Sequence, residues 1–83
     1  MLDTHQLNVF LEAADALSFT QAAQRLHMTQ PSVSQHIQTL EQHFGVPLFN
    51  RVGRYIELTD AGQALLPLAR ELVTRSVHIE ETM

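Results

Sequence analysis

The fold is decided by residues 18–35, which read SFTQAAQRLHMTQPSVSQ. Residues 20–27 have the spacing of a short amphipathic helix, for which Thr20 is a suitable N-cap. The pattern breaks at residues 28–30, and Pro31 suits the first turn of a new helix, where its missing N–H is not needed. The stretch therefore predicts two helices that are joined by a tight turn.

The second of these helices has one apolar and one polar face. Its apolar stripe consists of Val33, Ile37, Leu40 and Phe44, which recur at helical spacing. We expect this stripe to be buried, and we expect Gly45 to end the helix in a left-handed conformation. The opposite face carries hydroxyls and carboxamides but almost no charge: Ser32, Ser34, Gln35, Gln38 and Gln42.

A further helix precedes this pair, and a small hairpin follows it. Asp3 is a suitable N-cap for the first helix, whose apolar residues form one buried face as scaffold. Residues 48–51 and 55–58 are short runs that suit β-strands. The loop between them contains Gly53, which adopts a positive φ without strain, so we expect a β-hairpin.

The last predicted helix covers residues 60–83 and has an unusually broad apolar surface. At 1.5 Å per residue it runs about 36 Å, which is too long for so small a core to cover. We therefore expect a homodimer, with Pro67 introducing a bend in the first third of the helix. The residues expected in the dimer interface are Leu65, Leu68, Leu72 and Ile79.

Composition sets limits on what the protein can be. The 83 residues, of which 45% are hydrophobic, suit one small folded domain. The chain has no cysteine, which excludes disulfides and cysteine-based zinc sites. No apolar run approaches the ~20 residues that a membrane span needs, and the first residues do not resemble a signal peptide. We expect a soluble cytoplasmic protein without a membrane partner.

Charge is distributed unevenly along the chain. The formal net charge of −4 at first argues against binding to nucleic acid. However, residues 1–18 and residues 57–83 each sum to −3, whereas residues 19–56 sum to +2. The basic region thus coincides with the predicted pair of helices and the hairpin.

The polar helix face suits reading of the DNA major groove, which is about 12 Å wide and admits a helix. A glutamine carboxamide donates and accepts at once, which makes Gln35 and Gln30 candidate readers of adenine. Ser32 and Ser34 are candidates for a phosphate or a base, and the amides at the helix N-terminus for a phosphate oxygen. Pro31 offers an apolar contact, for example to a thymine methyl group. The alternative is that this face is only solvated.

Arg51 and Arg54 lie on the predicted hairpin, where a wing would reach the DNA backbone beside the groove. The alternative is that they form surface ion pairs with Glu57 or Glu41. No two of the five histidines have the i, i+4 spacing that brings imidazoles onto one metal ion, so we predict no metal site. Without a cysteine nucleophile, a Gly-rich phosphate loop or clustered carboxylates, we predict no enzyme activity.

Several motifs together resemble those of the LysR-type family of bacterial transcription regulators, and the resemblance covers nearly the whole chain. They are Phe19-Thr20-Gln21-Ala22-Ala23, Thr29-Gln30-Pro31-Ser32-Val33-Ser34, Leu40-Glu41 with Gly45, Leu48-Phe49-Asn50-Arg51, and Leu58-Thr59-Asp60-Ala61-Gly62. The resemblance implies a mainly α fold: a winged helix-turn-helix of three helices and a hairpin wing in residues 1–58, then a linker helix in residues 59–83. It also implies dimerisation through that helix, possibly a tetramer in the full-length protein, and a C-terminal domain that binds a small-molecule effector and is absent here.

The resemblance also assigns residues to DNA. It implies that Ser18 and Thr20 approach a phosphate and that Arg51 and Arg54 hold the backbone or the minor groove. With the helix face described above, the predicted DNA contacts are Ser18, Thr20, Thr29, Gln30, Pro31, Ser32, Ser34, Gln35, Gln38, Arg51 and Arg54. Gln35 stands where many members have arginine, and Gln38 where a basic residue is common. These departures put guanine reading and part of the phosphate affinity in doubt.

The resulting hypothesis is sequence-specific binding of double-stranded DNA by a homodimer at a dyad-symmetric operator, which regulates bacterial transcription. This chain itself is expected to hold no cofactor. The alternative is a module for protein assembly that does not bind DNA, in which the apolar helix serves association and the acidic net charge discourages nucleic acid. Salt separates the two hypotheses, because binding through arginines weakens as salt rises and apolar association does not.

Overall fold

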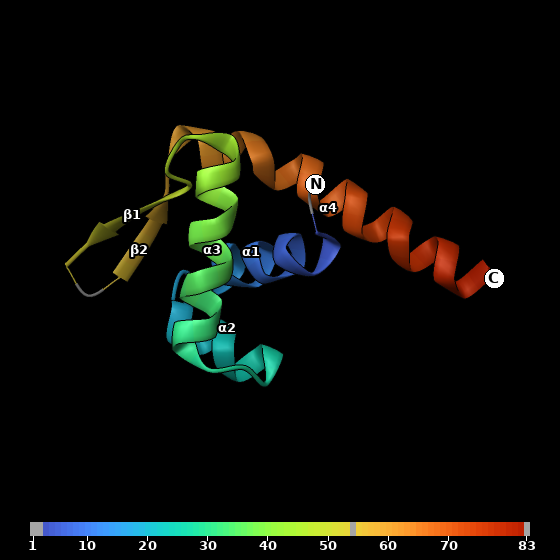
Figure 1. The fold of residues 1–83 in the computed structure, drawn as a ribbon, viewed down its shortest axis with the longest axis horizontal. Helices are drawn as coiled ribbons and strands as arrows, with labels where there is room; N and C mark the ends of the chain where they lie inside the picture. The colour runs from blue at the N-terminus through green and yellow to red at the C-terminus, as the bar shows by residue number, and fades with distance from the viewer. Residues whose placement is uncertain (1–2, 54, 83) are drawn as a thin grey trace.

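The computed structural model describes residues 3–53 and 55–82, with the side chains of the last helix described as far as Arg75. It contains four helices and a two-stranded antiparallel hairpin within this part of the chain (Figure 1). The elements in chain order are α1 (Thr4–Ala16), α2 (Phe19–Leu26), α3 (Gln30–Phe44), β1 (Phe49–Val52), β2 (Tyr55–Leu58) and α4 (Asp60–Thr82). The mainly α architecture with a hairpin wing is therefore confirmed.

The ends of the first two helices follow from local hydrogen bonding. Asp3 caps α1, as predicted, because its side chain accepts a hydrogen bond from the His5 amide. The prediction that Thr20 caps α2 was wrong: the cap is Ser18, whose hydroxyl accepts from the Gln21 amide at 3.1 Å, and Thr20 lies within the first turn. The expected end near His27 is confirmed, with that residue in the left-handed conformation at φ 55°.

The core lies where α1, α2, α3 and the base of the hairpin meet. Its buried residues are Leu7, Val9, Phe10, Ala13, Phe19, Ala22, Ala23, Val33, Ile37, Leu40, Leu48, Phe49, Ile56 and Ala69. The predicted stripe of α3 is buried except for Phe44, which is 38% exposed. Phe44 has the helical spacing of the stripe, but it lies at the end of α3, where the core no longer covers it. Gly45 ends the helix in the predicted left-handed conformation, at φ 73°.

The hairpin is short and is tethered at its base. Phe49 pairs with Leu58 and Val52 pairs with Tyr55, so β1 begins one residue later than the predicted run. Gly53 has a φ of 61° in the connection, which fits the predicted role of this glycine. Arg54 lies outside the described residues. Because Phe49 and Ile56 are buried in the core, the base of the hairpin is held against α1 and α2 while its tip projects.

Helix α4 begins in a tight junction with the segment before β1. Thr59 is its N-cap: the hydroxyl accepts from the Gly62 amide at 3.0 Å and donates to the Pro47 carbonyl at 2.7 Å. Gly62 packs so closely on the chain that a Cβ there would overlap the Leu48 carbonyl oxygen and approach a methyl of Leu58 to 2.8 Å. The glycine is thus required by the close approach of α4 to the hairpin base.

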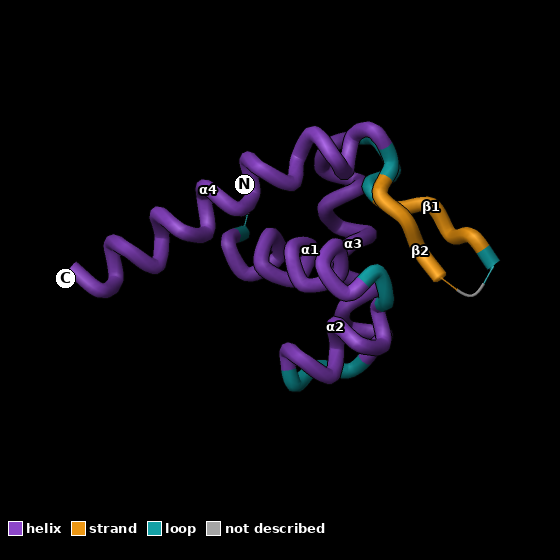
Figure 2. Tube along the Cα trace, turned by 180° about the vertical axis from the view of Figure 1, so that it is seen from behind, coloured by secondary structure: helices purple, strands orange, loops and turns teal. Residues whose placement is uncertain are grey.

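The molecule is elongated, with extents of 44 × 26 × 19 Å, because the hairpin and α4 project from opposite sides of the body (Figure 1). Helix α4 packs on α1 through Ala69 and neighbouring apolar residues and then runs beyond the body. Seen from behind, no other described helix or strand lies beside its C-terminal half (Figure 2). The helix is continuous through Pro67. No helix in the described part of the chain is long and apolar enough to cross a membrane.

Candidate nucleic-acid interface

The N-terminal half of α3 presents the predicted polar face to solvent. Burial of Val33, Ile37 and Leu40 fixes the orientation of the helix, so the opposite side faces outward. Gln30, Pro31, Gln35 and Gln38 are exposed, and Ser32 and Ser34 are half-buried along the edge of this face. The structure thus brings together the residues that were predicted to enter the major groove, on a helix that projects one clean face.

The backbone amides at the start of α3 are largely occupied. Thr29 is the N-cap, and its hydroxyl accepts from the Ser32 amide at 3.2 Å. Pro31 has no N–H, and the Val33 amide donates to the Thr29 carbonyl at 3.1 Å. Of this first turn, only the Gln30 amide has no partner among the described residues. The predicted phosphate contact through the amides of this helix therefore reduces to a single donor.

The N-terminus of α2 is more open. Ser18 occupies the Gln21 amide, and the Ala22 amide donates to the Ser18 carbonyl at 3.0 Å. The amides of Phe19 and Thr20 have no partner in the described part of the chain, and the Thr20 side chain is exposed beside them. A helix N-terminus with free amides is a favourable place for a phosphate oxygen. This arrangement suits the phosphate contact predicted for Ser18 and Thr20.

Arg51 lies between the hairpin and the recognition face. Its guanidinium carbon stands 5.4 Å from the centroid of the Phe19 ring, a cation–π geometry. Together with Ser34 and Gln38 it lines a cleft of about 150 Å³ between α3 and β1. No carboxylate of the described residues forms an ion pair with it. The alternative that Glu41 or Glu57 neutralises Arg51 therefore has no counterpart in the structure.

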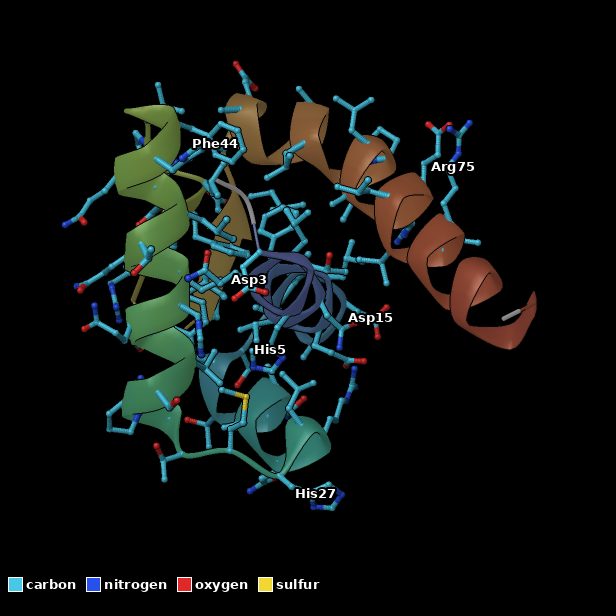
Figure 3. All side chains as sticks on the ribbon, turned by 45° about the vertical axis from the view of Figure 1, so that its right-hand side comes forward. Asp3, His5, Asp15, His27, Phe44 and Arg75 are labelled. Atoms are coloured by element: carbon cyan, nitrogen blue, oxygen red, sulfur yellow. The ribbon has the colours of Figure 1, made fainter. Side chains whose placement is uncertain are left out.

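Arg25, the other arginine of the central region, is neutralised through space. Its guanidinium donates to Asp15 of α1 at 2.8 Å and lies 3.7 Å from Glu12. Figure 3 shows Asp15 on the side of α1 that faces away from α3. The charge sum along the sequence therefore overstated the basic character near α3, because two acids from the preceding region fold back onto this arginine.

Glu41 has a structural role that sequence reasoning missed. It was considered only as an opposing charge, yet its carboxylate accepts hydrogen bonds from the amides of Leu48 and Phe49, at 2.7 and 3.4 Å. The carboxylate of α3 thus holds the first residues of the hairpin and sets the wing against the recognition helix. The seven-residue separation between Glu41 and Leu48, across a helix end, is a signal that no local pattern captures.

The predicted dimer residues divide into three groups. Leu68 and Leu72, which are 63% and 46% exposed, form an apolar stripe on α4. Leu65 packs partly against the core instead, and the side chain of Ile79 lies outside the described ones. Phe44 points from the end of α3 toward the start of α4 (Figure 3), and it lines an apolar groove of about 280 Å³ with Val46, Leu65 and Leu68. Sequence reasoning placed Phe44 in the core and missed this groove.

The fold also brings His5 and His36 together, with ring centroids 5.1 Å apart in an edge-to-face arrangement. The two residues come from α1 and α3, so their pairing was not visible from spacing along one helix. Among the described residues, no group of three His, Asp or Glu side chains is placed to hold a metal ion.

The body, the projecting polar helix and the hairpin beside it define a winged helix-turn-helix protein. Residues 4–63 match the family model described as bacterial regulatory helix-turn-helix protein, lysR family. The chain belongs to this family.

Individual relatives agree with this assignment. The chain is 48% identical over 73 residues to a helix-turn-helix transcriptional regulator of Azotobacter vinelandii, covering 88% of this chain and 51% of the relative. It is 42% identical over 79 residues to the transcriptional activator CmpR of Synechocystis, covering 95% of this chain and 26% of the relative. The chain thus spans between a quarter and about half of these relatives.

A solved structure also has the same fold. The crystal structure of the DNA-binding domain of CbnR in complex with DNA superposes with a TM-score of 0.92 at 37% identity. The superposition covers 98% of this chain and 93% of that one.

Proposed function

We propose that the chain is the DNA-binding part of a LysR-type transcription regulator and binds double-stranded DNA sequence-specifically as a homodimer. The observation that carries the proposal is the exposed, nearly uncharged polar face of α3 next to the unpaired Arg51 of the hairpin. The CbnR structure, whose DNA-binding domain is bound to DNA, supports it by likeness. As part of this proposal, the protein is not an enzyme and acts on the nucleoid in the bacterial cytoplasm.

The proposed dimer rests on the apolar stripe of α4. Leu68 and Leu72 are i, i+4 neighbours on a helix that projects beyond its own body, and such exposed leucines favour association with an apolar partner surface. Two copies joined through this stripe would place two α3 helices at the halves of a dyad-symmetric operator. A tetramer and a small-molecule effector concern the full-length protein and stay predictions.

Selection of binding sites from random double-stranded DNA tests the proposed function. We expect the wild-type chain to select a dyad-symmetric sequence, and Gln35→Ala to relax the preference at one symmetric position. If Gln35 pairs bidentately with adenine, the loss is about 1–3 kcal/mol per half-site, and Gln35→Arg shifts the preference toward guanine. Identical preferences of wild type and Gln35→Ala at every position would show that Gln35 does not read sequence.

The second test concerns Arg51, which we expect to contribute affinity without sequence information. Arg51→Ala should weaken binding to many sequences alike and reduce the salt slope by about 0.9 for the one phosphate lost. Arg25→Ala is the matched control, because this arginine is already paired with Asp15 and should change the slope little. A loss confined to one base pair, with an unchanged slope, would contradict the phosphate role. Binding that strengthens with salt would instead favour the protein-assembly alternative, for which no structural feature speaks.

A further inference from the structure

The polar face of α3 contains one side-chain pair that is already hydrogen-bonded without DNA. The Gln30 carboxamide nitrogen donates to the Ser34 hydroxyl oxygen at 2.8 Å, one helical turn further along. Gln30 is exposed, whereas Ser34 is half-buried between α3 and the hairpin. Gln35, the other candidate base reader, has no side-chain hydrogen bond among the described residues.

This bond restricts the more mobile of the two side chains. A free glutamine has three rotatable bonds beyond its Cα and loses their freedom when it pairs with a base. A carboxamide that is tied to a half-buried hydroxyl has already lost much of that freedom, so binding DNA costs less. One amide hydrogen and the carbonyl oxygen of Gln30 remain available to a base.

We propose that Ser34 is a positioning residue for Gln30: it holds the carboxamide in the orientation that reads a base, rather than binding a phosphate itself. The surroundings favour this assignment. Ser34 directs its oxygen along α3 toward Gln30, and the cleft that it lines already contains Arg51 as a stronger phosphate ligand. The inference rests on the proposed DNA binding.

Binding-site selection with Ser34→Ala tests the proposal. We expect the preference to weaken roughly 3- to 10-fold at the base pair that Gln30→Ala also affects, which is the range for loss of one net hydrogen bond. The salt slope should stay unchanged, and the double variant should behave like Gln30→Ala alone, because the two residues act as one unit. Ser34→Thr keeps the hydroxyl and should restore the preference.

Thr39→Ala provides the matched control. Thr39 also carries a half-buried hydroxyl on α3, but that hydroxyl donates to the backbone carbonyl of Gln35 at 3.0 Å, so its removal should leave every base preference unchanged. A circular dichroism melt of each variant verifies that α3 is intact.

Three results would overturn the proposal. A uniform loss of affinity with a smaller salt slope in Ser34→Ala would make Ser34 a phosphate ligand. Additive effects of Gln30→Ala and Ser34→Ala would make the two residues independent. A wild-type chain that selects no sequence would remove the proposed function itself, and the positioning role with it.

Discussion

Leu72→Arg is expected to convert the proposed dimer into monomers and to reduce apparent operator affinity by at least about 100-fold. Leu72 is 46% exposed on α4, in line with Leu68, so the substitution would place two arginines at the seam between copies. Two like charges without partners oppose apolar association, and two half-sites bound independently lose the gain from linkage, which is commonly about 10² to 10⁴. Analytical ultracentrifugation at micromolar concentration measures the first effect, and titration with operator DNA measures the second.

Thr74→Arg is the control for this variant. It adds the same charge two residues further along, on the opposite side of the helix from Leu72 and at an exposed position. It should remain dimeric and bind DNA at least as well as the wild type. A Leu72→Arg chain that still sediments as a dimer would disprove the assignment of this stripe to the interface.

Gly62→Ala is expected to destabilise the fold by about 1–3 kcal/mol or more, although alanine is the better helix former by about 1 kcal/mol. The reason is the packing of α4 against the hairpin base, where a new Cβ would overlap the Leu48 carbonyl. Backbone atoms do not move aside as a flexible side chain does. Thermal melts should therefore show a lower Tm, by about 4–8 °C for each kcal/mol in a domain of this size.

The neighbouring Gln63→Ala provides the comparison, because Gln63 is exposed in the same turn and its loss should change stability by no more than about 0.5 kcal/mol. Equal protein concentrations are needed, since a dimer links stability to concentration. A Tm of Gly62→Ala at or above the wild-type value would show that α4 does not pack as tightly as the structure has it.

Local patterns predicted most of this architecture because they report local physics. The buried stripe of α3, the glycine at its end and the cap at Asp3 follow from spacing and from backbone geometry, and all three are found. The cap of α2 was misassigned because Ser18 and Thr20 are both good caps two residues apart. Which hydroxyl reaches a free amide depends on the backbone that enters the helix.

Contacts between distant segments could not be predicted in this way. Pairing of Arg25 with Asp15 lowers the basic charge of the central region, and Glu41 binds the amides that begin the hairpin. Phe44 has core spacing but lies beyond the end of the core, beside α4. In the candidate site, sequence placed the residues on one face but did not show that Gln30 is tied to Ser34.

The junction at Thr59 and Gly62 makes α4 a rigid lever. The hydroxyl of Thr59 and the close backbone contact of Gly62 leave α4 no play against the base of the hairpin, and Glu41 fixes that base to α3. From the start of α4 to Leu72 the arm is about 18 Å long. A turn of about 10° at a seam near Leu72 would therefore swing the reading head by about 3 Å, close to the ~3.4 Å step between base pairs. Small rotations between two copies would thus be enough to change which operator spacing the pair can span.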